Sequence, residues 1–596
     1  MLCCVAEWEE EGSKRFKMVA LGAGGTLRKI RGVEQEYPVS ASAAFNPNLL
    51  VNAAIQGLRR KGFSKLVRWD ISTEVSQESH EFKITNSYGE NGCRIYNDLG
   101  HLEISTPSYN DPFDAVAYEK ASEIYAFVAS VGASVALKKR VLIHKNNVAN
   151  FFVKTAGGAV GLSGGGVRKG VEEKRVKTNT YATHGNFLTE RRACKDWRRV
   201  ERALIPWVVT RIIFTGAGDV ISGEIVKKSG IKFVISPRAM FVMRLSSLST
   251  TSARGILNTR DQPHASKKYF RLHDIHFEAL RSEYAIFLRD ITQALVIRAF
   301  ELGFLDDAPE IDDPVQTFKR ISADTQECEW RVRLKNGEQT DAVSILQFYL
   351  AKIEEMLSSG EAVAAAEEAV GSSGEGSERG EEVLREEEKW ESIGLKAFEE
   401  LLEKFAERRI EEFVDGVDWV TKLALLVNYQ PKRVSEGIFI CNQFALLDEG
   451  VLFYVRGDGF GESGGGVKQE QEEEGIAEGG ASEGRSLFSP RESLKFAQRK
   501  LPIRWSRLFE RVRYALRNAP EDTRDFFRAG MLKHFNEHVK SVSWSSLILN
   551  EAKIMLDEPF MLNKSELGDV FAASQEEDLS GILTEAKRLY PEKVIF

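Results

Sequence analysis

The stretch GCRIYNDLGHLEIST, residues 92–106, places Arg94, Tyr96 and Asp98 at alternate positions. Successive side chains of a β-strand point to opposite faces, so a strand here would project all three from one face. A structural strand usually alternates apolar with polar residues, whereas this same-face set is polar throughout. The stretch therefore predicts a strand that contacts a ligand.

A second acidic stretch, GVEQEY at residues 32–37, reads as another strand with Glu34 and Glu36 on one face. Together with Glu103 and Asp98 it supplies four carboxylates, which are hard oxygen ligands for Mg²⁺, while Arg94 offers a guanidinium for phosphate. Taken alone, Glu34 and Glu36 are also typical of the solvated face of an edge strand. The two stretches together favour a magnesium and phosphate site.

The overall composition is that of a soluble globular protein, with 43% hydrophobic and 28% charged residues and a formal net charge of -7. Mild acidity argues against general nucleic-acid binding, which needs a positive field. Six cysteines lack metal-ligand spacing, no apolar run is long enough to span a bilayer, and the first residues do not resemble a secretory signal. We therefore expect a cytoplasmic protein that binds neither nucleic acid nor membrane.

The length of 596 residues predicts more than one hydrophobic core. We expect an N-terminal extension over residues 1–27, a catalytic domain over residues 28–500 and a small C-terminal domain over residues 501–596. Stretches at about 157–177, 358–386 and 461–485 contain few large apolar residues. Because such stretches cannot bury enough surface to offset the entropy of ordering, they predict flexible insertions.

The two acidic stretches resemble a known family, the Pup ligase and Pup deamidase (depupylase) group. This is the proteasome accessory factor type within the glutamine-synthetase-like carboxylate-amine ligases. Its first motif, Gly-Ile-Glu-Thr-Glu-Tyr, corresponds to residues 32–37, and its second, Asn-Gly-Ala-Arg-Leu-Tyr-x-Asp, to residues 91–98. Further family motifs follow in the same order at Lys145 to Asn147, Pro206 to Gly218, Ser236 to Arg238, Asn258 to Ala265, Ala519 to Arg524 and Trp544. The resemblance therefore covers most of the chain.

The resemblance implies an α/β (α+β) fold of the glutamine-synthetase type, in which a curved antiparallel sheet cradles Mg-ATP and carries helices on its outer side. It implies Mg²⁺ ligands at Glu34, Tyr96 and Glu103, with Glu36 and His184 as further candidates. It implies ATP contacts at Arg94, Thr106 and Trp544, with Arg211 and Arg238 as further candidates. Asp98 would be the catalytic base. Trp544 taken alone would be assigned to a core, and His184, His264 and His273 divide evenly between site and structural roles.

Members of this family act on the side chain of the C-terminal Glu or Gln of Pup, a small protein modifier. The deamidase branch hydrolyses the amide or isopeptide bond. The ligase branch forms a γ-glutamyl phosphate that a target lysine attacks. Residues 68–70 and 111–116 favour the deamidase, with the ligase as the alternative. The expected partners are Pup or a Pup-like modifier and lysine-bearing target proteins.

Two positions depart from the family pattern. The family triplet His-Glu-Asn reads His184-Gly185-Asn186 here, and Glu-Pro-His reads Gln262-Pro263-His264. Each change removes a carboxylate, which predicts an altered metal stoichiometry or turnover. The same losses leave open a nucleotide-binding pseudoenzyme or regulator as a further alternative.

Overall fold

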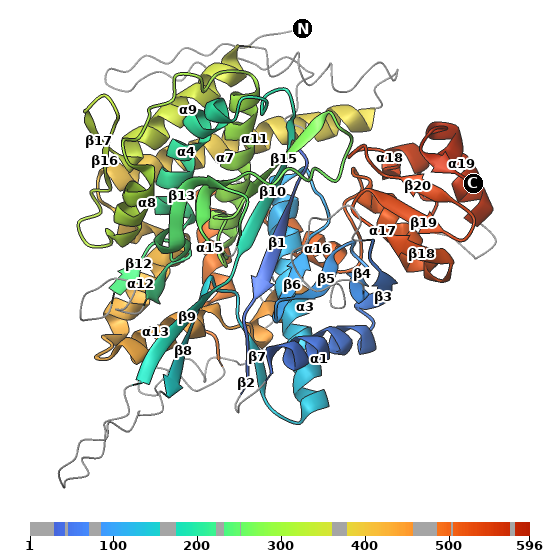
Figure 1. The fold of residues 1–596 in the computed structure, drawn as a ribbon, viewed down its shortest axis with the longest axis horizontal. Helices are drawn as coiled ribbons and strands as arrows, with labels where there is room; N and C mark the ends of the chain where they lie inside the picture. The colour runs from blue at the N-terminus through green and yellow to red at the C-terminus, as the bar shows by residue number, and fades with distance from the viewer. Residues whose placement is uncertain are drawn as a thin grey trace, which may run out of the picture.

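A nine-stranded sheet organises the computed structural model, which describes residues 29–41, 46–70, 85–154, 174–221, 232–250, 252–359, 378–456, 485–501, 503, 505–571 and 579–596. In sheet order the strands are β13 (Val242–Ser247), β14 (Arg254–Asn258), β15 (Tyr269–Asp274), β10 (Thr183–Glu190), β1 (Arg31–Tyr37), β6 (His101–Ser105), β5 (Arg94–Asp98), β4 (Thr85–Gly89) and β3 (Ser64–Arg68). Strands β1, β10 and β15 run side by side through the centre of Figure 1.

The sheet is mixed, which corrects the expectation of a wholly antiparallel one. Seven of the neighbouring pairs are antiparallel, but β13 and β14 are parallel. The connection between them returns the chain to the start of β13, so Val242 pairs with Arg254. The predicted α/β class is confirmed.

Helices cover one face of this sheet. Along β1 the side chains of Val33 and Tyr37 are buried in the core while Glu34 and Glu36 are half-exposed on the other face. The long helices α3 (Pro112–Leu137) and α7 (Glu283–Glu301) supply most of the opposing apolar surface. Helix α1 (Pro47–Arg60) crosses α3 so closely that a Cβ on Gly57 would lie 2.7 Å from the Cα of Gly132. The face away from the helices is therefore the one left for polar groups.

The remaining helices are α4 (Trp197–Thr210), α5 (Ile212–Thr215), α8 (Pro314–Ala323), α9 (Ala342–Ser358), α11 (Glu378–Ala406), α12 (Asp418–Tyr429), α13 (Val434–Ala445), α14 (Phe453–Arg456), α15 (Pro490–Lys500), α16 (Ser506–Ala515), α17 (Asp525–His534), α18 (Lys564–Leu567) and α19 (Leu579–Leu589). Short strand pairs are β2 (Val39–Ala41) with β7 (Val141–Ile143), β8 (Val148–Lys154) with β9 (Lys174–Thr180), β11 (Asp219–Ile221) with β12 (Lys232–Val234), and β16 (Arg331–Arg333) with β17 (Gln339–Asp341). Among the described residues, no helix is both long and apolar enough to cross a bilayer.

A second hydrophobic core lies in the C-terminal part. A four-stranded sheet of β18 (Val539–Val542), β19 (Ser546–Leu549), β20 (Lys553–Met555) and β21 (Val594–Ile595) packs with α17 and α19 beside β3 and β4, at one end of the large sheet (Figure 1). Buried apolar side chains between Leu501 and Leu516 belong to the first core, whereas those from Ala519 onward belong to the second. The predicted domain boundary at residue 501 thus falls in a stretch that packs on the larger part.

Two of the three predicted insertions contain regular structure at their ends. Residues 174–177 belong to β9, where they pair with β8, and residues 378–386 open helix α11. The second of these is rich in Glu and Arg, which are good helix formers even without apolar partners. The N-terminal extension, residues 155–173 and 360–377, and nearly all of 461–485 lie outside the described residues.

Candidate active site

The two acidic stretches form adjacent strands, as the sequence predicts. Glu36 on β1 pairs with Glu103 on β6, and Glu103 pairs with Tyr96 on β5. Two residues further along β6, Ser105 pairs with Glu34 on β1 and with Arg94 on β5. Directly paired residues share a face and lie within side-chain contact distance. The polar residues of both stretches therefore face the same space.

A two-residue turn fixes Asp98 at the end of β5. Leu99 and Gly100 both have positive φ, at 51° and 87°, which matches the turn that best joins two twisted strands. The side chain of Asn97 accepts a hydrogen bond from the Gly100 amide at 2.9 Å and donates to Asn48 and Asn52 on α1, each at 3.1 Å. Asp98 itself pairs with His101 across the hairpin. The turn and its anchoring to α1 hold this carboxylate in place.

Three carboxylates meet beside that turn. Oxygen atoms of Glu36, Asp98 and Glu103 lie within 4.8 Å of one another. Glu103 is buried and accepts a hydrogen bond from the hydroxyl of Tyr96. Burial and the charges of Asp98, Glu34 and Glu36 raise its pKa well above the usual range. Such crowding of acids is relieved by a bound cation, so this first acidic cluster suits Mg²⁺.

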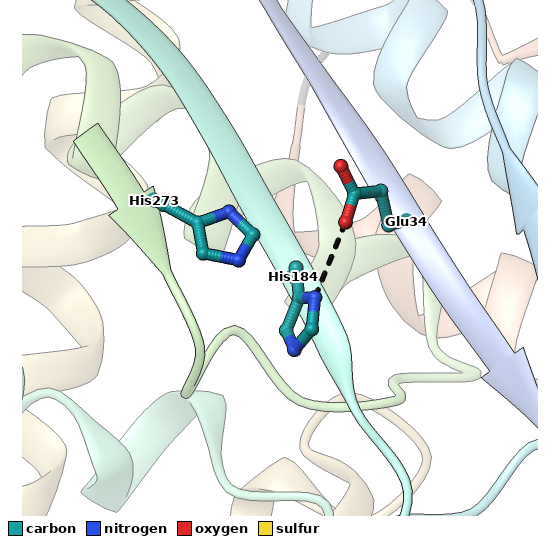
Figure 2. Close-up of side chains that lie close together, drawn as sticks. All are labelled: Glu34, His184 and His273. Carbon is teal, nitrogen blue, oxygen red and sulfur yellow. Dashed lines mark hydrogen bonds and ion pairs between the residues drawn. The ribbon is translucent and has the colours of Figure 1, made fainter. Parts of the chain in front are cut away.

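A second cluster combines Glu34 with His184 and His273, with ligand atoms again within 4.8 Å of one another (Figure 2). His184 Nδ1 lies 3.2 Å from a Glu34 oxygen, and His273 Nδ1 lies 2.8 Å from the side-chain oxygen of Asn186. Among the described residues, the Nε2 atoms of both buried histidines have no hydrogen-bond partner. These atoms and the Glu34 carboxylate fit a second metal ion.

The charge states of this second cluster favour metal binding. Burial alone would raise the pKa of Glu34, but the hydrogen bond with His184 and the charge of Arg271 hold it well below the usual range. Burial and the charges of Arg271 and His184 lower the pKa of His273. A carboxylate that stays ionised and an imidazole that stays neutral are the forms that bind metals.

A pocket adjoins the second cluster where the large sheet meets the C-terminal part. Thr106 and Trp544, two of the expected ATP contacts, both line it, and the Thr106 hydroxyl accepts from the Val33 amide at 3.0 Å. The same pocket includes Glu34. Its other polar lining residues are Arg31, Ser105, Ser108, Asn186, His264, Arg271 and Arg524. This combination of cations, hydroxyl groups and an indole fits a nucleotide.

Arg94 lies beside this pocket between two aromatic rings. Its guanidinium carbon is 4.2 Å from the ring centre of Trp69 and 4.0 Å from that of Tyr96. Its Nε donates to the side-chain oxygen of Asn86 at 2.9 Å. Trp69 in turn packs edge-on against Trp544, with ring centres 5.2 Å apart. Through Trp69, this stack connects two expected ATP contacts, Arg94 on the large sheet and Trp544 in the C-terminal part.

Arg211 and Arg238, the other two expected ATP contacts, are not brought to the pocket. Arg211 is buried and pairs with Asp274 at 2.6 Å. Arg238 donates to the carbonyl groups of Ile275 and Tyr181 at 2.8 and 2.9 Å. These bonds hold the backbone next to β10 and β15, so both arginines have a structural role in this part of the fold.

Gly185 does not remove a carboxylate from the site, contrary to the expectation from its motif. His184 and Asn186 point to the metal clusters, so the residue between them points to the helices. A Cβ on Gly185 would lie 2.8 Å from the ring of Phe277. A longer side chain at this position would meet the core rather than a metal.

Two further site residues, Asn186 and Arg271, fell outside the predicted set, and His273 was divided evenly between a site and a structural role. Arg271 and His273 stand at alternate positions in YFRLHD, the pattern that singled out residues 94–98. Asn186 donates to Glu34 at 3.1 Å and is bonded by Arg271 Nη1 at 3.0 Å. The alternation of polar residues in β15 was the signal that would have identified this strand as part of the site.

Comparisons with known proteins bear on the family and the fold. Residues 29–153 and 174–438 match the family model for the Pup-ligase protein. The depupylase of Acidothermus cellulolyticus is 26% identical over 576 residues, covering 91% of this chain and 96% of that protein. The Pup–protein ligase of Acidimicrobium ferrooxidans is 28% identical over 408 residues, covering 68% and 74%.

Solved structures resemble the fold over nearly the whole chain. The ligase PafA in its complex with the prokaryotic ubiquitin-like protein Pup has a TM-score of 0.61 at 20% identity, covering 96% of this chain and 94% of that one. PafA in complex with ADP has a TM-score of 0.56 at 20% identity, covering 93% and 96%. Since the family model matches well over half of the residues, the chain belongs to the Pup ligase and depupylase family of enzymes.

Proposed function

We propose that this chain is a magnesium- and ATP-dependent deamidase and depupylase. It would hydrolyse the side-chain amide of a C-terminal Gln, or the isopeptide bond to a target lysine, in Pup or a Pup-like modifier. The observation that carries the proposal is the position of Asp98, at the rim of an acidic cluster and on the sheet face that leads to the pocket. Matches to depupylases over 91% of the chain support the hydrolytic branch.

The residues present fit both expected cofactors. Glu36, Glu103, Glu34 and His184 would hold Mg²⁺, since the first cluster is crowded with acids and His184 Nε2 is buried without a partner among the described residues. Thr106 and Trp544 would contact the nucleotide, with Arg94 supporting them. When bound, Mg-ATP supplies positive charge that neutralises phosphate and carboxylate oxygens.

Tyr96 acts through a hydrogen bond in this proposal. Burial and the Glu103 charge raise its pKa well above the usual range, so the phenol keeps its proton at neutral pH. That proton is donated to Glu103. Tyr96 would then orient the carboxylate that holds the metal, in addition to any contact of its own.

Asp98 would act as the base. A carboxylate beside the scissile carbonyl takes a proton from water and so makes the water a nucleophile, or it attacks the carbonyl directly. The ligase alternative uses the same group differently, because Asp98 would remove a proton from the lysine amine that attacks a γ-glutamyl phosphate. Ligases match at 28–29% identity over 55–68% of the chain, and these matches support the ligase as the second candidate function.

One incubation separates these functions. The protein is mixed with Mg-ATP, Pup ending in Gln or Glu, and a lysine-rich target, and products are followed by mass spectrometry and ADP release. Amide hydrolysis without net ATP consumption supports the deamidase. Conjugation with stoichiometric ADP release supports the ligase, and nucleotide binding with neither reaction supports a regulator.

A further inference from the structure

A short segment connects the first acidic cluster to two arginines that the catalytic proposal does not use. Residues 180–182 comprise the last residue of β9 and the two residues that connect it to β10. The Thr180 hydroxyl accepts from Arg254 Nη2 at 2.6 Å, the Tyr181 carbonyl accepts from Arg238 Nη1 at 2.9 Å, and the Ala182 amide donates to Glu36 at 2.6 Å. Three consecutive residues therefore tie both guanidinium groups to a carboxylate of the cluster.

The same segment reaches the Asp98 hairpin. The ring of Tyr181 packs against that of His101, with centres 4.7 Å apart. His101 pairs with Asp98 across the hairpin, and its Nδ1 lies 3.7 Å from Glu36. Arg254 is thus linked to the Asp98 hairpin indirectly, through Thr180, Tyr181 and His101, and its charge interacts with Glu36 of the first acidic cluster. Asn258, at the other end of β14, pairs with His273 beside the second cluster.

Arg254 lies within the field of the Glu36 carboxylate, but it is not in salt-bridge contact with any described acid. Its Nε donates to the Thr250 carbonyl at 2.6 Å and its Nη2 to Thr180, and within the described residues it forms no salt bridge. The neighbouring Arg238 is buried, and its Nη2 has no hydrogen-bond partner among those residues. Two adjacent guanidinium groups in a partly buried corner favour binding of an anion.

The proposed reaction supplies such an anion. An enzyme that processes the side chain of a C-terminal Gln must distinguish it from every internal Gln, and only the C-terminal residue carries a free α-carboxylate. A planar guanidinium is the group best matched to a carboxylate. The α-carboxylate is separated from the side-chain amide by only a few bonds, so its binding group must lie close to Asp98.

Resting on the proposed function, we propose that Arg254 binds the α-carboxylate of the C-terminal residue of the modifier, with Arg238 supplying charge beneath it. Arg254 is then a specificity-determining residue. It admits a free chain end to the first acidic cluster and rejects an internal or capped one.

The test compares two substrates with three variants. The substrates are Pup ending in Gln with a free α-carboxylate and the same Pup with that group converted to an α-carboxamide. The wild-type protein should prefer the free acid by about 10- to 100-fold in kcat/KM, the range expected for one charge-assisted contact. Arg254→Gln should reduce kcat/KM for the free acid by a similar factor and bring the ratio close to one, while Arg254→Lys should retain part of the preference.

Arg244→Gln is the matched control. Arg244 is an exposed arginine on β13, and it pairs with Gly255, the neighbour of Arg254. It should keep the wild-type ratio, and the affinity of each variant for Mg-ATP reports folding. A wild-type preference that persists in Arg254→Gln would overturn the assignment.

Binding of the two Pup forms, measured by titration calorimetry, tests the contact without turnover. If the wild-type protein hydrolyses neither substrate, the proposed function fails. The α-carboxylate contact then stands only if binding discriminates between the two forms and Arg254→Gln abolishes that discrimination.

Discussion

Asp98 can be tested by a substitution that keeps its shape. Asp98→Asn removes the basic oxygen but retains the size of the side chain, and the turn that positions it depends on Asn97 and Gly100. We expect kcat to fall by about 10²- to 10⁴-fold, the usual contribution of a general base, with Mg-ATP affinity nearly unchanged. Single-turnover hydrolysis and nucleotide titration measure the two quantities. Retained turnover would remove Asp98 from the role of base.

Glu103 predicts a pH dependence of magnesium binding. Its pKa is raised by burial and by three neighbouring carboxylates, so in the metal-free protein it holds a proton at pH values above 4.5 at which an exposed Glu has lost it. Mg²⁺ binds the ionised form and must displace that proton. Affinity should therefore rise with pH from 4.5 up to the raised pKa and then level off.

The proton released by Glu103 is measurable. Calorimetric Mg²⁺ titrations in two buffers of different ionisation enthalpy give the number of protons displaced on binding. Glu103→Gln should weaken binding and flatten its pH dependence, whereas Glu592→Gln, at an exposed position, should leave both unchanged. An unchanged pH profile in Glu103→Gln would show that another group accounts for the proton.

The residues of the site were predictable to the extent that their arrangement is local. Alternation within 32–37 and within 92–106 placed Glu34, Glu36, Tyr96 and Asp98 on one face, because the period of a strand depends only on the backbone. The choice between a site role and a structural role for His273 could not be made in this way. His273 joins Glu34 and His184 because β15 pairs with β10, and that pairing joins two strands that are far apart in the sequence, with His273 opposite Asn186. The supporting positions of Arg211 and Arg238 likewise depend on what packs around them.

Strand β10 shows why a motif departure can be misread from sequence alone. The loss of Glu at position 185 reads as a lost ligand until the strand shows that position 185 faces Phe277. In the same way, residues 378–386 contain few large apolar side chains and were predicted to belong to a flexible insertion, yet they form the start of helix α11. Composition measures how much surface a segment can bury, and it does not exclude a helix.

Gly185 gives a prediction on stability. Gly185→Ala should destabilise the protein by about 1–3 kcal/mol, because the added Cβ meets the Phe277 ring in a packed core. Gly185→Glu should be less stable still and should gain no activity. Urea unfolding measures both. The control is Gly581→Ala on α19, where an added Cβ meets nothing within 4 Å and helix propensity should favour the alanine. A more active Gly185→Glu would place this position in the site after all.

The two cores of the molecule meet at the pocket, so the C-terminal part contributes to the site. Tyr88 on β4 and Trp69, which directly follows β3, belong to the second core, and Trp69 forms a β-bridge with Val542. Arg528 on α17 crosses the same boundary. It donates to the Tyr88 hydroxyl at 2.8 Å, to the Trp544 carbonyl at 2.7 Å, and to Asp525. The position of Trp544 in the pocket thus depends on a buried ion pair of the C-terminal part.

Arg528→Gln should weaken nucleotide binding through this connection. Both side chains of the Arg528–Asp525 pair are fully buried, so removing the cation leaves an uncompensated carboxylate, at a cost of about 3–5 kcal/mol. Hydrogen exchange should increase over residues 525–571, and the Kd for Mg-ATP should rise while the acidic clusters of the large sheet keep their structure. Arg588→Gln breaks an exposed pair with Glu585 on α19 and should change neither. Nucleotide affinity that survives the loosening of residues 525–571 would show that the large sheet binds ATP alone, and Trp544 would then lose its place as a nucleotide contact.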